Sequence, residues 1–346
     1  MNEKIAFVGA GAVGGYVGGH MARAGHDVTL IDPWASHVAQ IKSRGLQLGG
    51  TQGEHTVRVK ALDLAAVQSL APAVDIAFIC MKLYDTDWAA ALITPYLAPG
   101  GIVVTMQNGL VEEQVARIAG WGRTLGCIAS TISVEAVAPG HIVRTQMPGG
   151  DTYTVFRVGE LNGLATPRAQ RVAELLRAVD SAKVTANLWG ERWSKLTANT
   201  MTTGLCGASG LDLNEVVSYE PARRLQIQLA AEGIRVGIAA GFRLESIRGL
   251  AAEKWLSAAA GDAAALAVVE QSMLEGLRRR PEGGRSGTAQ DIAKGRRTEV
   301  DFMNGYVAVR GDELGIPAPT HAAIAALVTR VECGELAPAR ELLAGL

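Results

Sequence analysis

Short apolar runs alternate with helix-like stretches through the first third of the chain. The runs are rich in Val, Ile and Phe, are short enough to be buried strands, and occupy residues 5–8, 27–32, 74–81 and 102–106. Helical patterns follow the first three runs, while 45–48 and 56–59 have the pattern of a strand hairpin. Strands that alternate with helices usually pair in parallel, with helices on both faces. The sequence therefore predicts an α/β class with a doubly wound parallel sheet.

The pattern changes twice after this alternation. A turn is predicted at Pro99-Gly-Gly101, and extended segments dominate from about residue 125 to 188. We expect these segments to extend the first sheet, partly antiparallel; they are 127–134, 141–145, 153–158 and 183–187, with one helix at 167–179. From Trp189 onward almost every residue has a helical pattern. The predicted domains are therefore 1–188 and an all-helical 189–346.

A glycine-rich turn follows the first predicted strand. Its glycines have the G-x-G-x-x-G spacing, and a helix is predicted from about residue 12. The first glycine permits a tight turn, the second lets the backbone approach a pyrophosphate, and the third brings the helix close to its strand. Such a turn can also be purely structural, but here a strand, a helix and a second strand stand where a dinucleotide site needs them. The residues predicted to bind the cofactor are Gly9, Ala10, Gly11, Ala12, Val13 and Gly14. Asp32 ends the second strand, 18 residues after Gly14, where a carboxylate can accept hydrogen bonds from a ribose 2′-OH.

Composition narrows the class of protein. The 346 residues carry 33 basic and 34 acidic side chains, so no electrostatic footprint for nucleic acid or an anionic membrane is visible. No run of about 18 uncharged apolar residues predicts a membrane span. The four cysteines include no C-x-x-C pair, and the six histidines show no ligand spacing. We therefore expect a soluble cytoplasmic protein without a metal site.

Two polar residues stand where later strands of the parallel sheet end. Lys82 follows the strand at 74–81, and Asn108 follows the strand at 102–106. Ligands of such sheets lie outside the carboxyl ends of the strands, which makes both residues candidates for cofactor or substrate contacts. The alternatives are a solvated loop lysine and an asparagine that tolerates a left-handed turn before Gly109.

The helix that opens the second domain carries a polar stripe. At about 100° per residue, Lys195 and Asn199 lie about 40° apart, and Thr203 follows one turn later. A solvated surface stripe is the alternative to a polar cleft. A second constellation contains Glu299 and Asp301, which cannot share one helix face, and the residues alone do not say which of them would face a site.

Several separated motifs together resemble the ketopantoate reductase (2-dehydropantoate 2-reductase) family over nearly the full length. They are the turn at 9–15, Lys82-x-x-Asp-Thr86, Gln107-Asn-Gly109, Trp193-x-Lys-x-x-x-Asn199, Thr298-Glu-Val-Asp301 with Asn304-Gly305, and Glu313-Leu-Gly-Ile-Pro-Ala-Pro319. The resemblance implies an N-terminal Rossmann NAD(P)-binding domain and a helical catalytic domain like that of 6-phosphogluconate dehydrogenase, with the active site in the cleft between them. It implies NAD(P)H-dependent reduction of ketopantoate to (R)-pantoate, a step of pantothenate biosynthesis.

The resemblance also implies residue roles. Lys195 matches the family's proton donor, Lys82 the lysine at the nicotinamide side, and Glu299 the glutamate near cofactor and substrate hydroxyl, in preference to Asp301. Asn108 and Asn199 match asparagines that contact substrate. A lysine ammonium suits this reaction, because it can stabilise the alkoxide that hydride transfer leaves and then give it a proton.

Three positions depart from the family pattern. Thr203 stands where a second asparagine is common, and Gly287 stands where a serine is common, so Ser286 or Thr288 would have to substitute. Lost polar contacts alter selectivity, so a different small 2-keto acid is an open alternative. Asp32-Pro33 replaces the arginine that holds the 2′-phosphate of NADPH, which favours NADH unless Arg44 or another basic residue reaches that phosphate.

Three readings of the function follow. The first is the ketopantoate reductase, the second is a dehydrogenase of another hydroxy acid, and the third is a dinucleotide-binding regulator without turnover. Lys195 favours an enzyme, since a regulator needs no proton donor. A homodimer is also expected, because it is common in the family.

Overall fold

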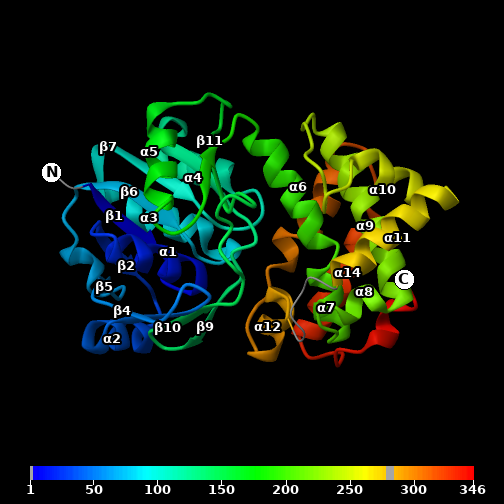
Figure 1. Ribbon diagram of the computed structural model, residues 1–346, viewed down its shortest axis with the longest axis horizontal. Coiled ribbons are helices and arrows are strands. Elements are labelled where there is room, and N and C mark those ends of the chain that lie inside the picture. The colour runs from blue at the N-terminus through cyan, green and yellow to red at the C-terminus, as the bar shows by residue number, and fades with distance from the viewer. Residues whose placement is uncertain (1–2, 278–283) are drawn as a thin grey trace. The chain divides into compact units, whose positions relative to one another are not determined.

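The computed structural model describes residues 3–277 and 284–346, and these residues form two compact units. The N-terminal unit is Met1–Leu188, and the C-terminal unit is Trp189–Leu346 (Figure 1). The first contains both sheets, and the second is built from helices.

The main sheet of the N-terminal unit has eight strands in the order β12-β11-β8-β7-β6-β1-β2-β5. All neighbouring pairs are parallel except β8 with β11. The strands are β1 Lys4–Val8, β2 Asp27–Ile31, β5 Lys60–Leu62, β6 Val74–Ile79, β7 Leu97–Thr105, β8 Thr124–Ala129, β11 Phe156–Glu160 and β12 Ala182–Val184. The predicted α/β class with a parallel sheet is confirmed.

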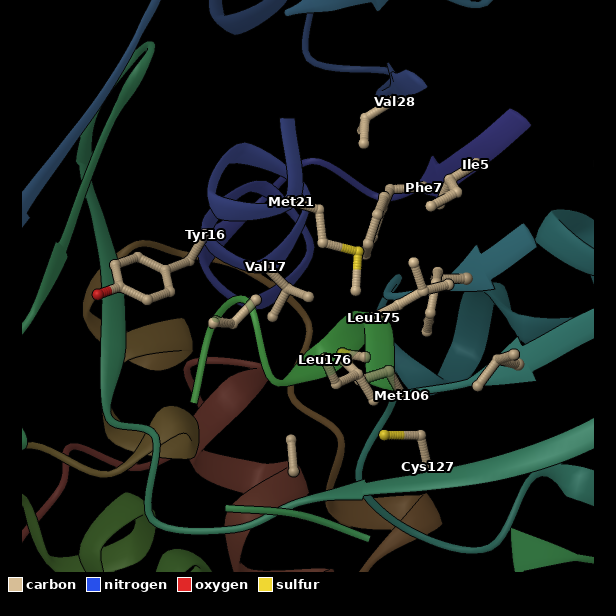
Figure 2. Packing of buried hydrophobic residues seen from close by; sticks show 14 of the residues in the cluster. Ile5, Phe7, Tyr16, Val17, Met21, Val28, Met106, Cys127, Leu175 and Leu176 are labelled. Carbon is tan, nitrogen blue, oxygen red and sulfur yellow. The ribbon is translucent and has the colours of Figure 1, made fainter. Parts of the chain in front are cut away.

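Helices cover both faces of this sheet, which explains why its central strands are mostly apolar and buried. Ile5 and Phe7 of β1 belong to the core cluster with helices α1 (Ala12–Arg23), α2 (Ala35–Arg44) and α5 (Pro167–Leu176). Figure 2 shows members of this cluster, among them Phe7, Val17, Met21 and Leu176. The alternate residues of β1, Ala6 and Val8, belong to the cluster with α3 (Thr86–Ile93) and α4 (Glu112–Ala119). Each fully buried Phe or Leu of these clusters contributes roughly 1.5–3 kcal/mol.

A second sheet, of four strands in the order β4-β3-β10-β9, packs against α1. It contains β3 Leu46–Gly50, β4 His55–Val57, β9 Val134–Ala138 and β10 His141–Arg144. The predicted hairpin at 45–59 is confirmed as β3–β4. The expectation that every later strand extends the first sheet was wrong for β9 and β10, because β10 pairs in parallel with β3 instead.

Glycines on α1 make room for this second sheet. A Cβ on Gly15 would lie 2.4 Å from Ile142 Cδ1, and a Cβ on Gly19 would lie 2.7 Å from Leu46 Cδ2. Both glycines therefore permit close contact between α1 and the second sheet, and a larger residue at either position would force these side chains to shift.

The predicted turn at Pro99–Gly101 was also wrong, since these residues lie within β7. Val74 pairs with Leu97 and Ile76 with Ile102, so the intervening residues of β7 form a bulge in the ladder. Gly101 faces the partner strand closely, because a Cβ there would lie 2.5 Å from Val74 O. The turn residues thus produce a bulge rather than an end of the strand.

The C-terminal unit buries one continuous apolar cluster between its helices. Apart from a bridge between Ile247 and Leu250, its described residues form no extended pairing. Its helices are α6 Leu188–Thr200, α7 Thr203–Ser209, α8 Glu215–Ser218, α9 Glu220–Ala239, α10 Ala252–Ala259, α11 Ala263–Leu277, α12 Gly287–Ala293, α13 Asn304–Glu313 and α14 Pro319–Glu332, with 3₁₀ turns η5 Val300–Phe302 and η6 Arg340–Leu343. Over the part of the chain that the structure describes, no helix has the length and apolar character to span a bilayer.

Candidate active-site residues

The glycine-rich turn has the geometry of an anion cradle. Gly9 adopts φ +99°, and a Cβ there would lie 2.7 Å from the carbonyl carbon of Cys80. A Cβ on Gly14 would lie 1.9 Å from Gly9 O, so α1 can approach β1 only with glycine at this position. At Gly11, which caps the N-terminus of α1, a Cβ would meet nothing within 4 Å. The turn is therefore closed toward β6 and open at Gly11, where the first N–H groups of α1 can receive an anion.

Asp32 is tied to this turn. It is 7% exposed, its Oδ2 accepts a hydrogen bond from Ala10 N–H (2.7 Å), and its Oδ1 accepts one from Trp34 N–H (2.8 Å). Each carboxylate oxygen keeps a further lone pair for a hydroxyl donor. Two backbone donors therefore fix the orientation of the carboxylate at the carboxyl end of β2.

The carbonyl of Ala10 is held from the other side by His37. The imidazole is buried, its Nδ1 accepts a hydrogen bond from Gly140 N–H (2.9 Å), and its Nε2 lies 2.9 Å from Ala10 O. Because a backbone N–H can only donate, Nδ1 carries no proton, and Nε2–H must be the donor to Ala10 O. Burial lowers the pKa of His37, and the Asp32 carboxylate and the bond to Ala10 oppose this only in part. His37 is therefore neutral, with a defined tautomer.

Lys82 and Asn108 follow the neighbouring strands β6 and β7. Lys82 is partly exposed and precedes the 3₁₀ turn Leu83–Asp85, while Asn108 is exposed. The buried amide of Gln107 joins the two segments, since its Nε2 donates to Thr86 Oγ1 (2.9 Å) and to Lys82 O (3.4 Å).

The residue with positive φ in this segment is Gly109 (φ +70°), not Asn108. A need for a left-handed asparagine therefore does not explain Asn108. In the order β7-β6-β1-β2, four adjacent strands carry Asn108, Lys82, the glycine turn and Asp32 at their carboxyl ends.

The C-terminal unit presents Lys195 and Asn199 on α6. Both side chains are partly exposed, whereas Trp193, Leu196 and Thr200 are buried. The spacing of four residues places the lysine and the asparagine one above the other on the accessible stripe of the helix. The stripe therefore exposes an amine and a neutral amide, while the neighbouring residues of the helix are buried. Such a stripe is suited to a polar site.

Thr203 does not continue this stripe. Helix α6 ends at Thr200, and Thr203 is the first residue of α7. The Thr200 hydroxyl donates to Thr197 O (3.1 Å), which competes with the regular helix ladder at this point. The expectation that Thr203 follows Asn199 one turn later on the same helix was therefore wrong, because Thr203 belongs to a separate helix.

Two side chains from distant segments hold the break between α6 and α7. The Arg248 guanidinium donates to Ala198 O (3.3 Å) and to the Thr202 hydroxyl. Asn304 is fully buried, and its Nδ2 donates to Thr200 O (3.2 Å) and lies 3.2 Å from His321 Nδ1. The last carbonyls of α6 are thus satisfied by side chains, which fixes the end of the helix that carries Asn199.

The second constellation separates its two carboxylates. Asp301 is exposed and pairs with exposed Arg297 (3.4 Å), whereas Glu299 is partly buried before the 3₁₀ turn Val300–Phe302. A solvated ion pair suits Asp301. Glu299 remains the candidate.

Ser286 has a structural role. Its hydroxyl accepts from Ala289 N–H (3.2 Å) as the N-cap of α12, donates to Thr203 O (3.4 Å), and belongs to a side chain that is 4% exposed. Gly287, where the family commonly has serine, is exposed. The hydroxyl of Ser286 is therefore engaged within the protein, and we do not propose it as a substrate contact.

Sequence reasoning missed three buried residues that hold these segments, namely His37, Gln107 and Asn304. Gln107 and Asn304 lie inside recognised motifs, so their positions could have been noticed. A single histidine on an amphipathic helix gave no such signal.

Comparison with known proteins identifies the family. A family model described as ketopantoate reductase PanE/ApbA matches residues 5–157, and the model of its C-terminal domain matches residues 187–332. The chain belongs to the ketopantoate reductase family. It is thus an oxidoreductase, and its family uses a pyridine nucleotide.

Individual members of the ketopantoate reductase family align over nearly the whole chain. The 2-dehydropantoate 2-reductase of Archaeoglobus fulgidus is 27% identical, with 96% of this chain and 99% of the relative covered. That of Halobacterium salinarum is also 27% identical, with 94% and 97% covered. The solved structure of a PanE/ApbA family ketopantoate reductase from Ralstonia eutropha JMP134 is 28% identical with a TM-score of 0.78, covering 96% and 99%. D-Mandelate dehydrogenase, solved with NADH and anilino(oxo)acetate, shares the fold at 20% identity and a TM-score of 0.78, covering 96% and 98%.

Proposed function

We propose that this member of the ketopantoate reductase family reduces 2-dehydropantoate to (R)-pantoate, a step of pantothenate biosynthesis, with a reduced nicotinamide dinucleotide. The observation that carries the proposal is the polar stripe of α6, where partly exposed Lys195 and Asn199 stand four residues apart in a chain that aligns end to end with 2-dehydropantoate 2-reductases. A lysine amine on the accessible stripe of a largely buried helix can serve as the acid that a keto-acid reductase needs.

The glycine turn fits a dinucleotide. Gly9 and Gly14 permit the close packing of β1, β6 and α1, and the space at Gly11 leaves room for a pyrophosphate against the N-terminus of α1. Gly9, Ala10, Gly11, Ala12, Val13 and Gly14 would hold the pyrophosphate, Asp32 the adenosine ribose, and Lys82, Asn108 and Glu299 the nicotinamide end. When bound, the reduced nicotinamide supplies the hydride.

We propose NADH rather than NADPH as the preferred cofactor. Asp32 cannot readily rotate away from a 2′-phosphate, because Ala10 N–H and Trp34 N–H hold both of its oxygens. Arg44, the alternative partner for that phosphate, lies at the far end of α2 from Asp32. Ten helical residues rise about 15 Å, which is more than an arginine side chain spans.

In the proposed reaction the residues of this chain handle the proton and the substrate. As the 2-keto carbon gains a C–H bond, its carbonyl oxygen takes negative charge, and the Lys195 ammonium stabilises that charge and transfers a proton to the oxygen. Neutral amides of Asn108 and Asn199 can orient the carboxylate and hydroxyl of the substrate without adding a competing charge. Glu299 can accept a hydrogen bond from a substrate hydroxyl.

A second candidate is the oxidoreduction of a different small 2-keto or 2-hydroxy acid. Thr203 begins a separate helix, and Gly287 has no side chain to offer, so two positions where relatives commonly have polar groups differ here. The fold shared with D-mandelate dehydrogenase is compatible with other acids. A third candidate is a dinucleotide-binding regulator, but such a protein would not need the proton donor that Lys195 can provide.

The test is the oxidation of NADH and of NADPH, followed at 340 nm, against ketopantoate and a panel of 2-keto acids. Ketopantoate should give the highest kcat/KM with NADH. A higher kcat/KM for another acid would favour the second candidate, and dinucleotide binding without turnover of any acid would favour the regulator.

We further propose a homodimer in a reducing cytoplasm. The assembly is supported by a structural relative, the dimeric ketopantoate reductase from Staphylococcus aureus. The compartment is supported by Cys80, Cys127, Cys206 and Cys333, all of which are free thiols. Light scattering of the purified protein tests the assembly.

A further inference from the structure

The two peptide planes on either side of Ala10 are both fixed by side chains that follow β2. Asp32 accepts from Ala10 N–H, which fixes the Gly9–Ala10 plane. His37 donates from Nε2 to Ala10 O, which fixes the Ala10–Gly11 plane. Because a trans peptide is planar and its C=O and N–H point in opposite directions, a carbonyl directed at His37 directs the Gly11 N–H away from it.

The surroundings of Gly11 are open on its Cβ side. Gly11 has no atom within 4 Å of its Cβ position and stands at the N-terminus of α1. The N–H groups in this position are the ones that bind phosphate in a nucleotide turn. The hydrogen bond from His37 therefore determines where a phosphate donor points.

Besides Ala10, Gly140 and Trp34 hold His37 in place. Its Nδ1 accepts from Gly140 N–H in the turn between β9 and β10, and its ring stacks on Trp34, with centroids 4.9 Å apart and planes 9° apart. A Cβ on Gly140, whose φ is +71°, would lie 2.6 Å from Gln40 Cγ of α2, so the turn approaches α2 closely. Both nitrogens of the buried ring are hydrogen-bonded, so His37 connects the second sheet to the glycine turn in a fixed geometry.

We propose that His37 is a positioning residue of the dinucleotide site: its Nε2–H holds the Ala10–Gly11 peptide in the orientation that presents Gly11 N–H to the cofactor pyrophosphate. This inference rests on the proposed function only in requiring that the protein bind a nicotinamide dinucleotide. His37 is fully buried and acts on the glycine turn through Ala10 O, so we expect it to affect cofactor binding and not the chemical step.

Two substitutions separate the two ends of the imidazole. The amide of His37→Gln reaches about as far as Nε2 and can donate to Ala10 O, but it leaves Gly140 N–H without its acceptor. The amide of His37→Asn reaches about as far as Nδ1, so it keeps the acceptor for Gly140 N–H and loses the donor to Ala10 O. Both variants remove the ring and its stacking on Trp34 equally.

The experiment measures the Kd for NADH by fluorescence titration, kcat at saturating NADH, and the melting temperature of the wild type and both variants. We expect the Kd of His37→Asn to rise about tenfold, the equivalent of one buried hydrogen bond. The Kd of His37→Gln should stay within about threefold of wild type, and kcat should be unchanged in both.

Equal Kd values for the two variants, whether raised or not, would overturn the proposal, because a merely structural histidine makes no distinction between its nitrogens. A Kd that follows the melting temperature rather than the donor to Ala10 would overturn it as well. If the wild type binds neither NADH nor NADPH, the proposed function and this inference both fail. If it binds NADH but reduces no 2-keto acid, only the proposed reaction fails, and the two variants still decide the role of His37.

Discussion

The two units hold their candidate functional groups in different ways. In the N-terminal unit, the groups offered to a dinucleotide are largely backbone N–H groups of a turn, and buried Asp32 and His37 fix that turn. In the C-terminal unit, the candidate groups are side chains of α6, and buried Asn304 fixes the end of that helix. A backbone N–H survives every substitution except one to proline, whereas a side-chain group is lost when its residue is replaced. Substitutions around the turn should therefore change cofactor affinity, and substitutions on α6 should change turnover.

Both units nevertheless use a buried neutral histidine in the same tautomer. In His321, Nε2 lies 2.9 Å from Leu229 O and must carry the proton, so Nδ1 accepts from Asn304 Nδ2. In His37, Nδ1 accepts from a backbone N–H directly. The C-terminal unit thus adds one side chain, Asn304, between its histidine and the backbone that it fixes. This relay makes the helix break sensitive to substitutions at two positions.

The largest effect should come from Lys195→Ala. Removing the proposed acid should lower kcat by roughly 10²–10⁴-fold while the Kd for NADH changes little. Stopped-flow turnover together with fluorescence titration of NADH measures the two quantities. Lys294→Ala, at an exposed lysine of the same unit, is the matched control and should leave both unchanged. Loss of NADH binding in Lys195→Ala without loss of kcat at saturation would assign this lysine to structure.

Asp180→Asn should produce the largest loss of stability, and it should do so in the N-terminal unit. Asp180 pairs with Arg144 at 2.6 Å, and the two side chains are 1% and 0% exposed. Burial alone would raise the pKa of Asp180, but hydrogen bonds from Ser181 N–H, Arg144 and Gly149 N–H outweigh it and hold the pKa below its usual value. Removing the carboxylate charge leaves Arg144 buried without a counterion, at a cost of about 3–5 kcal/mol in the free energy of unfolding.

Denaturant unfolding measures this loss. The control is Glu220→Gln, which breaks the exposed pair Glu220–Arg224 and should cost less than about 1 kcal/mol. If the two variants lose similar amounts of unfolding free energy, the buried pair Arg144–Asp180 does not stabilise the contact between β10 and the segment before β12. The depressed pKa of Asp180 also implies that its stabilising effect is complete above about pH 4 and is lost as the pH falls through the lower folded value.

Acid should destabilise the C-terminal unit through His321. Burial lowers the pKa of His321 to about 4, although its bond to Leu229 O opposes the shift. The unfolded chain binds a proton near pH 6.5 and the folded protein only near 4, so the free energy of unfolding should fall as the pH decreases through this window. The full difference amounts to about 3 kcal/mol. Unfolding free energies of the wild type and His321→Gln, measured from pH 7.5 to 4, check this.

The variant should be less stable at pH 7.5 and show a shallower dependence on pH. His20, in the N-terminal unit, also has a pKa lowered to about 4, chiefly by burial, so His20→Gln should remove a separate part of the slope. A slope that neither substitution changes would place the acid sensitivity elsewhere.

The features that the sequence predicts correctly are those set by local constraints. The strands β1, β2, β6 and β7 and the glycine turn follow from apolar runs and from backbone positions at Gly9 and Gly14 that only glycine can occupy. The accessible stripe with Lys195 and Asn199 follows from helical spacing alone. Each of these signals lies within a few residues of the feature that it predicts.

The features that were missed depend on partners far away in the chain. Strand β10 joins the second sheet because His141 pairs with Gln47 of β3, a choice that no local pattern encodes. Helix α6 ends at Thr200 because Arg248 and Asn304 satisfy its last carbonyls, and threonine alone is too weak a signal for an end. The role of His37 is visible only once Gly140 and Ala10 stand on opposite sides of its ring.

The smallest effect should come from substitutions of Asp32, which has both a structural role and a proposed role in cofactor selection in the N-terminal unit. Its carboxylate holds Ala10 N–H and, in our proposal, discriminates against the 2′-phosphate of NADPH. Asp32→Ala removes both roles, so it should raise the KM for NADH and reduce the ratio of kcat/KM for NADH over NADPH by about tenfold, or 1.4 kcal/mol. Asp32→Asn removes the charge and keeps one of the two oxygen acceptors, so it should change the ratio with a smaller rise in the KM for NADH than Asp32→Ala. Steady-state kinetics with both cofactors separate these effects. If the ratio of kcat/KM for NADH over NADPH is unchanged in both variants, Asp32 does not contact the ribose. Its role is then only to hold the backbone of the turn.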